Sequence, residues 1–199
     1  MAQFRSRPFG VTKDGEKVNE YIMSNPGGLA VSVLNYGCVI KNIIVPAKNG
    51  PVDVVLDATT IGLGILDTGT LDIVEGETAA SVLLRFLQEY GYDPDYQGTA
   101  TMNFYLRRIN RGDIAYRANV PEHLWELILR DGITTNDNYD RDSIGEFDYT
   151  QGSGWMYSIN GTLYEGTGMS GYKVRNGITI YVRFTLAYGK DIGGYSSPG

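Results

Sequence analysis

Two residue types are nearly missing from this 199-residue sequence, which has one cysteine, Cys38, and one histidine, His123. A single cysteine excludes an internal disulfide and a zinc site built on several thiolates. A single histidine excludes His-rich metal sites and makes any Ser-His-Asp chemistry depend on His123. Cys38 falls in an alternating apolar run, which indicates a buried, inert thiol. His123 falls in the first turn of a short predicted helix, which indicates a surface position.

Long apolar runs and basic clusters are also missing. No apolar run reaches ~18 residues, so the sequence predicts no membrane span. The net charge is −6 and the isoelectric point about 4.8, which argues against a nucleic-acid partner. The opening residues Met1–Arg5 lack the apolar segment of a signal peptide, so the chain is expected to be cytoplasmic if Met1 is its natural start.

The composition that remains is that of a β-rich folded protein. Hydrophobic residues make up 42% of the chain and charged residues 20%, so it can bury a core. The 26 glycines predict many turns and few long helices. The 15 tyrosines suit half-exposed sheets, because the ring packs while the hydroxyl reaches water. We therefore expect an α+β, β-rich fold.

The first quarter of the chain has the pattern of an antiparallel β-meander. Short β-branched runs are separated by Gly, Pro and Asn turns, such as Ser24–Gly28 and Asn35–Gly37. The predicted strands are Val18–Met23, Leu29–Leu34, Val39–Val45 and Val52–Leu56.

Several short motifs recur through this stretch: Phe9-Gly10, Asp14-Gly15, Leu34–Gly37, Ile43–Pro46, Asn49-Gly50 and Val52–Leu56. In order and spacing they resemble the N-terminus of galactose mutarotase (aldose 1-epimerase). The resemblance implies a few strands of a β-sandwich, and it assigns residues 1–51 to a fragment of that fold. The sugar-binding motif, the two histidines and the late glutamate base of that family do not appear further along the chain, so no catalytic residue carries over.

The run Val52–Leu56 satisfies two patterns, because it ends the meander and begins the second part of the chain. No Ser-, Gly- or Pro-rich linker of ~10 residues separates the halves. We therefore expect one continuous sheet, and loss of residues 1–50 would then expose apolar surface. In such a sheet the largely buried residues would be Val31, Val33, Val39 and Ile43.

The second part of the sequence combines strands with two helices. Apolar residues from Ala79 to Tyr90 recur at helical spacing, with a helix entry at Glu75–Thr78 and a stop at Gly91. A shorter helix begins near Pro121 and ends at Asp131-Gly132. The predicted strands are Thr70–Val74, Met102–Ile109, Gly154–Ile159, Tyr172–Val174 and Ile178–Ala187, with a polar acidic loop over Thr134–Asp148 and hairpin turns at Asn160-Gly161 and Asn176-Gly177.

A series of motifs runs through the second part of the chain: Gly76–Ala79, Gly152–Gly161, Gly168–Tyr172, Asn176-Gly177 and Tyr188–Gly193. With the helix and the final strand, these motifs over residues 52–194 resemble the transcobalamin C-terminal-like family. The resemblance implies a β-grasp-like α+β domain over residues 52–199, an extracellular or cell-surface location, and a binding role. Cobalamin or another corrinoid is the ligand that it suggests, and no cofactor is required.

The resemblance also suggests which residues would meet a ligand. Trp155 and Tyr157 could stack on a flat macrocycle or a sugar, although alternation along the strand equally fits Trp155 as a core anchor. The loop after the last strand could bind a ligand or be a strand-ending turn with a solvated Lys190–Asp191 pair. The full candidate set is Trp155, Tyr157, Met169, Tyr172, Tyr188, Lys190 and Asp191.

One stretch has the alternating oxygens that wrap a hard cation such as Ca²⁺. Two positions depart from a calcium-binding EF-hand loop, because Arg141 holds the glycine position and Phe147 the bidentate glutamate position. A solvated acidic loop is the alternative. The candidate ligands are Asn136, Asn138, Asp140 and Asp142.

Three functions remain open from the sequence. The leading one is a non-catalytic binding module for a small ligand or a protein surface. The second is a structural subunit or spacer that self-associates through open strand edges of residues 1–51. The third is an epimerase, which needs a positioned acid and base where only His123 is available.

Overall fold

The chain forms two compact units, Met1–Lys48 and Asn49–Gly199. The computed structural model describes residues 3–26, 29–37, 40–44, 50–163 and 167–194, with side chains described at all of these except 41–44 and 163. Strands hold 44% of the residues and helices 15%, which confirms the α+β, β-rich class. Cys38 and Val39 lie outside the described residues.

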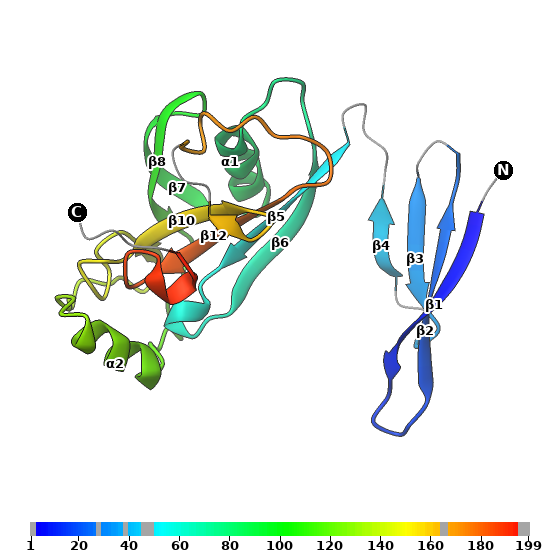
Figure 1. Ribbon diagram of the computed structural model, residues 1–199, viewed down its shortest axis with the longest axis horizontal. Helices are drawn as coiled ribbons and strands as arrows, with labels where there is room; N and C mark the ends of the chain where they lie inside the picture. Colours follow the sequence, from blue (N-terminus) through cyan, green and yellow to red (C-terminus); the bar gives the residue numbers. More distant parts are fainter. Residues whose placement is uncertain (1–2, 27–28, 38–39, 45–49, 164–166, 195–199) are drawn as a thin grey trace. The chain divides into compact units, whose positions relative to one another are not determined.

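The first unit is a single antiparallel sheet of four strands in the order β1-β2-β3-β4 (Figure 1). Three of the strands match the predicted meander, and β1 was missed because Pro8 interrupts it. Proline is found in edge strands, where its missing N–H is tolerated, and β1 lies at an edge with a register shift between Pro8 and Gly10. The strands are β1 (Gln3–Val11), β2 (Lys17–Ser24), β3 (Ala30–Leu34) and β4 (Ile40–Ile44).

The two faces of this sheet differ from the predicted pattern. Val31 and Val33 are only half-buried, so the expectation that they are largely buried is wrong. The buried residues, Val18, Glu20 and Ser32, belong to the opposite face. Glu20 tolerates burial because Arg7 Nε donates to its carboxylate at 2.7 Å. The Ile43 side chain lies outside the described residues.

The second unit is built on a five-stranded sheet in the order β11-β10-β12-β5-β6. Its first and last long strands, β5 and β12, pair in parallel at the centre, and every other pair of neighbouring strands in the sheet is antiparallel. This is the predicted β-grasp-like arrangement. The strands are β5 (Pro51–Asp57), β6 (Ile65–Asp72), β10 (Gly154–Ile159), β11 (Thr162–Leu163) and β12 (Thr179–Thr185), and a 3-10 turn, η1 (Thr59–Ile61), follows β5.

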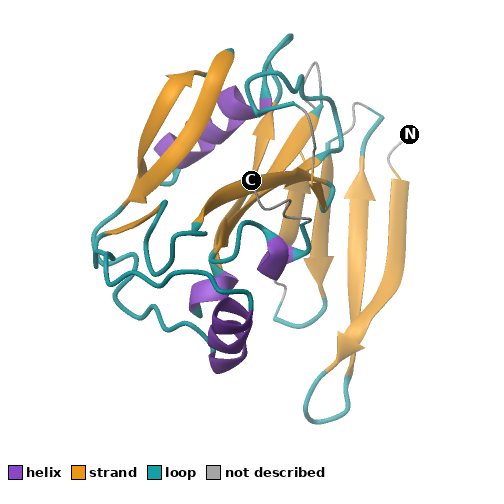
Figure 2. Cartoon of the chain, turned by 60° about the vertical axis from the view of Figure 1, so that its left-hand side comes forward, coloured by secondary structure: helices purple, strands orange, loops and turns teal. Residues whose placement is uncertain are grey.

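Helix α1 (Ala79–Glu89) lies between this sheet and the β7–β8 hairpin (Figures 1 and 2). Its predicted entry and stop are confirmed. Thr78 is the N-cap and its hydroxyl accepts from Ser81 N at 3.1 Å, while Gly91 has a left-handed φ of 74°. The predicted apolar stripe is buried at Ala79, Val82, Leu83, Phe86 and Leu87.

A second, three-stranded sheet, β7-β8-β9, completes the unit. Its hairpin is β7 (Asp93–Thr99) with β8 (Met102–Asn110), and β9 (Ser143–Gly145) pairs with the far end of β8. Helix α2 (Glu122–Arg130) matches the predicted short helix and carries the exposed His123. A last 3-10 turn, η2 (Lys190–Ile192), follows β12. No helix in the described residues combines the length and apolar character that crossing a bilayer needs.

Four element predictions for this unit need correction. The predicted acidic loop Thr134–Asp148 contains the buried strand β9. Tyr172–Val174 forms only an isolated bridge at Lys173. β6 begins earlier than predicted and contains Gly69, where a Cβ would lie 2.5 Å from the Tyr90 hydroxyl, so this glycine allows close packing rather than breaking the strand. β7 was missed because it contains Pro94 and Gly98.

The expected continuous sheet is also wrong. β5 is hydrogen-bonded on one side to β12 and on the other to β6. Both edges of β5 are therefore occupied within the second unit, and the strands of the first unit form a sheet of their own. The run Val52–Leu56 is an inner strand of the second unit only.

Candidate functional site

A polar hollow of about 330 Å³ opens beside β8 and β9, under the loop that follows α2. We call it the tyrosine hollow. Its size falls in the range of small-molecule sites. Its lining combines one aromatic ring with carboxylate, amide, hydroxyl and guanidinium groups: Arg108, Asn110, Asn138, Tyr139, Asp140, Ser143 and Asp148.

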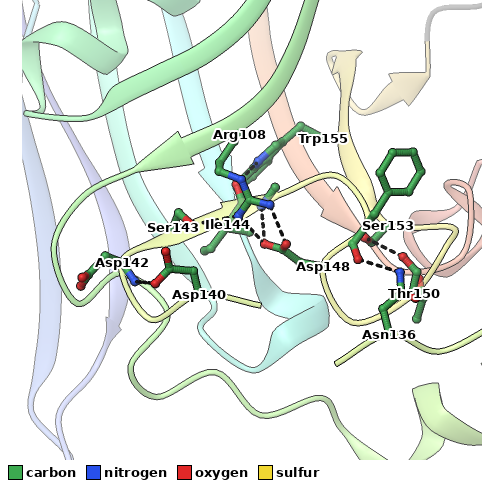
Figure 3. A network of polar contacts seen from close by, with 12 residues as sticks. Arg108, Asn136, Asp140, Asp142, Ser143, Ile144, Asp148, Thr150, Ser153 and Trp155 are labelled. Atoms are coloured by element: carbon green, nitrogen blue, oxygen red, sulfur yellow. Dashed lines mark hydrogen bonds and ion pairs between the residues drawn. The ribbon is translucent and has the colours of Figure 1, made fainter. Parts of the chain in front are cut away.

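An ion pair between the half-buried Arg108 and the buried Asp148 forms the base of the hollow (Figure 3). Arg108 donates to both carboxylate oxygens of Asp148, at 2.7 and 2.8 Å, and also to Ser143 Oγ at 2.8 Å. The N–H of Gly145 donates to Asp148 Oδ2 at 2.7 Å. Burial raises the pKa of Asp148, while the bonds from Arg108 and Gly145 work in the opposite direction. The pair therefore fixes β8, β9 and the following turn to one another.

The turn after β9 has an unusual backbone. Phe147 and Tyr149 have φ of 65° and 70°, a left-handed conformation that side chains with a Cβ rarely adopt. Asn136 holds both residues: its Nδ2 donates to Phe147 O at 2.9 Å and its N–H donates to Tyr149 O at 2.7 Å. Thr150 Oγ1 donates to Leu186 O at 2.6 Å. Strained, heavily braced backbone of this kind is concentrated at functional sites.

Tyr149, in the left-handed turn, stacks on Tyr139 of the preceding loop, with Tyr149 buried and Tyr139 exposed. The two rings lie 4.9 Å apart with an interplanar angle of 8°. Tyr149 is 7% exposed and Tyr139 is 61% exposed. The hydroxyl of Tyr149 is buried and has no hydrogen-bond partner among the described residues, and burial raises its pKa to about 12. Tyr139 is thus an exposed aromatic platform whose inner face is held by the buried ring of Tyr149.

The four predicted calcium ligands do not converge. Asn136 holds the left-handed turn, Asp140 Oδ1 accepts from Asp142 N at 3.0 Å, and Asp142 Oδ1 accepts from Asp113 N at 2.7 Å. No group of three or more His, Cys, Asp or Glu side chains in the described residues is placed to hold a metal ion. Of the four, only Asn138 and Asp140 line the tyrosine hollow.

Trp155 occupies the position of a core anchor. It is 9% exposed, its ring meets Phe184 edge-on at 5.2 Å, and its Nε1–H donates to Ile144 O at 2.9 Å. Tyr157 faces the same side of β10, is half-buried, and donates its hydroxyl to Thr167 O. Both rings therefore belong to the packing of the sheet in this structure.

The other predicted ligand residues lie at opposite ends of the five-stranded sheet. Met169 O and Tyr172 O accept from Ala80 N and Ala79 N at 3.2 and 2.9 Å, so they cap α1 at the end where β6 finishes. Tyr188 follows the other end of β12, after Thr185.

The loop after β12 packs against the start of β10. Tyr188 N donates to Gly152 O at 2.9 Å. Asp191 accepts from Leu186 N at 2.7 Å and from the hydroxyl of Thr185, which closes the strand end. Lys190 pairs with Asp131 at the end of α2, not with Asp191. This loop therefore lies beside the residues that lead into β10, but the seven candidates do not form one pocket.

Most residues that build the tyrosine hollow were not predicted from the sequence, Asn138 and Asp140 being the exceptions. Arg108 and Asp148 are 40 positions apart, and nothing in the local pattern pairs them. The signal that could have found them was the aromatic content of the acidic stretch, where Tyr139, Phe147 and Tyr149 lie among carboxylates.

No protein-family model and no curated protein matches this sequence. The two family resemblances therefore remain predictions. Function is inferred instead from the geometry of the second unit.

Replacing Asp148 by Asn should lower the free energy of unfolding by about 3 kcal/mol, because it leaves the Arg108 charge half-buried without its carboxylate. The matched control is Asp95→Asn, which removes the exposed partner of Arg107 and should cost less than about 1 kcal/mol. Urea unfolding measures both. Equal losses in the two variants would contradict the bracing role of the buried pair.

Replacing Tyr149 by Phe should raise the free energy of unfolding by about 1 kcal/mol, because it removes a buried hydroxyl that has no partner among the described residues. Tyr157→Phe is the control, and its free energy of unfolding should fall by a similar amount, since the Tyr157 hydroxyl donates to Thr167 O.

The pH dependence of stability gives a second test of the Tyr149 hydroxyl. Its pKa of about 12 in the folded protein, against 10.0 for a free tyrosine, means that the native protein loses stability as the pH rises from 10 to 12. Tyr149→Phe should remove that part of the loss, and a destabilised variant would show that the hydroxyl is satisfied.

Proposed function

We propose that the second unit is a non-catalytic binding module and that the tyrosine hollow is its ligand site. The observation that carries the proposal is the supported Tyr139 platform beside polar groups that are still free. Asn138 makes no side-chain hydrogen bond to a described residue, and one oxygen of Asp140 is uncommitted. A fixed aromatic face with a few uncommitted polar groups is the usual composition of a small-molecule site.

The arrangement favours binding over catalysis. The carboxylate of Asp148 is occupied by Arg108 and Gly145, so it is poorly placed to abstract a proton. General acid–base chemistry needs a group within hydrogen-bond reach of the substrate and a pKa near the working pH. Besides the Arg108–Asp148 pair, the titratable groups of the lining are the exposed carboxylate of Asp140 and the exposed hydroxyl of Tyr139.

The transcobalamin-like motifs make a corrinoid the first ligand to test, and they suggest an extracellular or cell-surface location. A hollow of about 330 Å³ lies near the lower end of ligand-site volumes. A corrinoid would therefore insert one edge of its periphery and lay the rest against Tyr139.

Cyanocobalamin should shift the backbone amide resonances of residues 136–149 saturably in a titration of the ¹⁵N-labelled chain. Tyr139→Ala should weaken binding at least about tenfold, which is the size of a single aromatic contact in a binding site. Tyr188→Ala is the matched control, because Tyr188 is 54% exposed at the other candidate loop. A loss with Tyr188→Ala alone would move the site to that loop, and no saturable shift at ~1 mM would exclude a corrinoid.

Self-association through the first unit is the second candidate function. Phe4, Met23 and Val31 are directly opposed on neighbouring strands, so they share one face of the sheet. Phe4 and Met23 are 65% and 45% exposed. The outer edge of β1 is less suited to pairing, because Pro8, the register shift and the two arginines of the strand all discourage strand addition. The apolar face supports assembly better than that edge.

Light scattering after size exclusion should find a dimer whose population rises with concentration. Met23→Lys should restore the monomer, because it places a charge in the centre of the apolar face. Leu129→Lys is the control, since Leu129 is equally apolar and 71% exposed in the second unit. A monomer at every concentration would remove this candidate.

A further inference from the structure

A second hollow lies where the two central parallel strands end. It has a volume of about 200 Å³ and shares no lining residue with the tyrosine hollow. We call it the arginine hollow. Its lining comes from the end of β5, η1, the end of β12 and η2: Asp57, Thr59, Thr60, Arg183, Phe184, Asp191 and Ile192.

Arg183 is the unusual member of this lining. Its side chain is 28% exposed, yet its Nε is buried and has no hydrogen-bond partner in the described part of the chain. Other arginines of the unit, such as Arg85 and Arg108, donate to a carboxylate within 2.8 Å. The guanidinium of Arg183 rests on the Tyr181 ring at 4.8 Å, which holds it without using its N–H groups. The buried Nε is out of reach of a ligand. The terminal N–H groups of Arg183 also make no hydrogen bond to a described residue, and because Arg183 lines the hollow, they mark a position for an acceptor.

The carboxylate of Asp57 lies close to Arg183 Nε but beyond hydrogen-bond range. Asp57 lies opposite Arg183 in the parallel register, and its Oδ2 is 3.8 Å from Arg183 Nε. The other oxygen, Oδ1, accepts from Thr59 N at 2.8 Å. Arg183 and Asp57 therefore border the same hollow as a loose ion pair without a hydrogen bond between them, and a bridging group could bond to both.

The charges of the lining indicate which kind of ligand group could bridge Arg183 and Asp57. Arg183 contributes one positive charge and Asp57 one negative charge. A second carboxylate, Asp191, has both oxygens occupied by bonds from Thr185 and Leu186, so it repels an anion but offers little to a cation. A carboxylate would bind Arg183 but meet two like charges, and a cation would bind Asp57 but meet Arg183. A neutral group with an acceptor and a donor side by side meets neither penalty.

We infer that the arginine hollow binds a carboxamide group of a ligand. Its carbonyl oxygen accepts from the terminal N–H groups of Arg183, and its N–H donates to Asp57 Oδ2. The planar guanidinium suits a planar partner, and Ile192 offers an apolar contact for the rest of the ligand.

Three isosteric probes test the inference: benzamide, benzoate and benzamidinium. Each is titrated into the ¹⁵N-labelled chain, with the Arg183 Nε–Hε resonance and the amides of residues 57–61 and 189–193 as reporters. Benzamide should bind in the range expected of a fragment of its size, about 1–10 mM. It should bind at least about tenfold more tightly than either charged probe, since a like-charge contact is costly.

Arg183→Gln and Arg183→Lys should each weaken benzamide binding at least about tenfold, because neither keeps the planar fork of donors. Arg183→Lys keeps the charge and the length of the stem, so it guards against a loss caused by misfolding. Arg175→Gln, at an exposed position outside the hollow, should leave benzamide binding unchanged. Preference for benzoate, equal binding in the Arg183 variants, or no saturable shift with benzamide would each overturn the inference; the last would mean that water bridges the pair.

Discussion

The parallel pairing of β5 with β12 is the contact on which the second unit depends. The pair joins Asp53–Asp57 to Thr179–Arg183, so the first strand of the unit is completed only by its last. Buried side chains on both strands, Val54 and Val182 among them, form the middle of the core. Thr60 Oγ1 donates to Phe184 O across 124 positions of sequence. Contacts of such separation close large loops, so they form late and at a high entropic cost.

Both hollows depend on the pairing of β5 with β12. The arginine hollow lies at the end of the parallel pair, where Asp57 faces Arg183. The tyrosine hollow is linked to β12 more indirectly. Trp155 pairs with Phe184 in register and donates to Ile144 O in β9, while Thr150 donates to Leu186 O beyond the end of β12. The left-handed turn at Phe147 and Tyr149 is therefore fixed to the centre of the sheet, which offsets a strain of about 1–3 kcal/mol for each such residue.

The sequence predicts those parts of the fold whose cause is local. Helix α1 follows from its apolar stripe and its Thr78 cap, and the Asn160-Gly161 turn adopts the two left-handed φ values that its residues favour. β1 and β7 are not predicted from the sequence, because proline usually indicates the end of a strand, although edge strands tolerate it. The hollows depend on pairs such as Arg108–Asp148 and Asp57–Arg183, whose members are distant in sequence. Local periodicity cannot indicate which distant charges will meet.

Native-state hydrogen exchange tests the claim that β5 belongs to the second unit and closes it. We predict that the amides of β5 and β12 exchange last, and that they open together with one free energy. Destabilising the core at Val182 should then lower the protection of both strands equally. The account would be contradicted if the amides of β5 exchanged together with those of β2 and β3 while β12 stayed protected, because β5 would then belong to the sheet of the first unit.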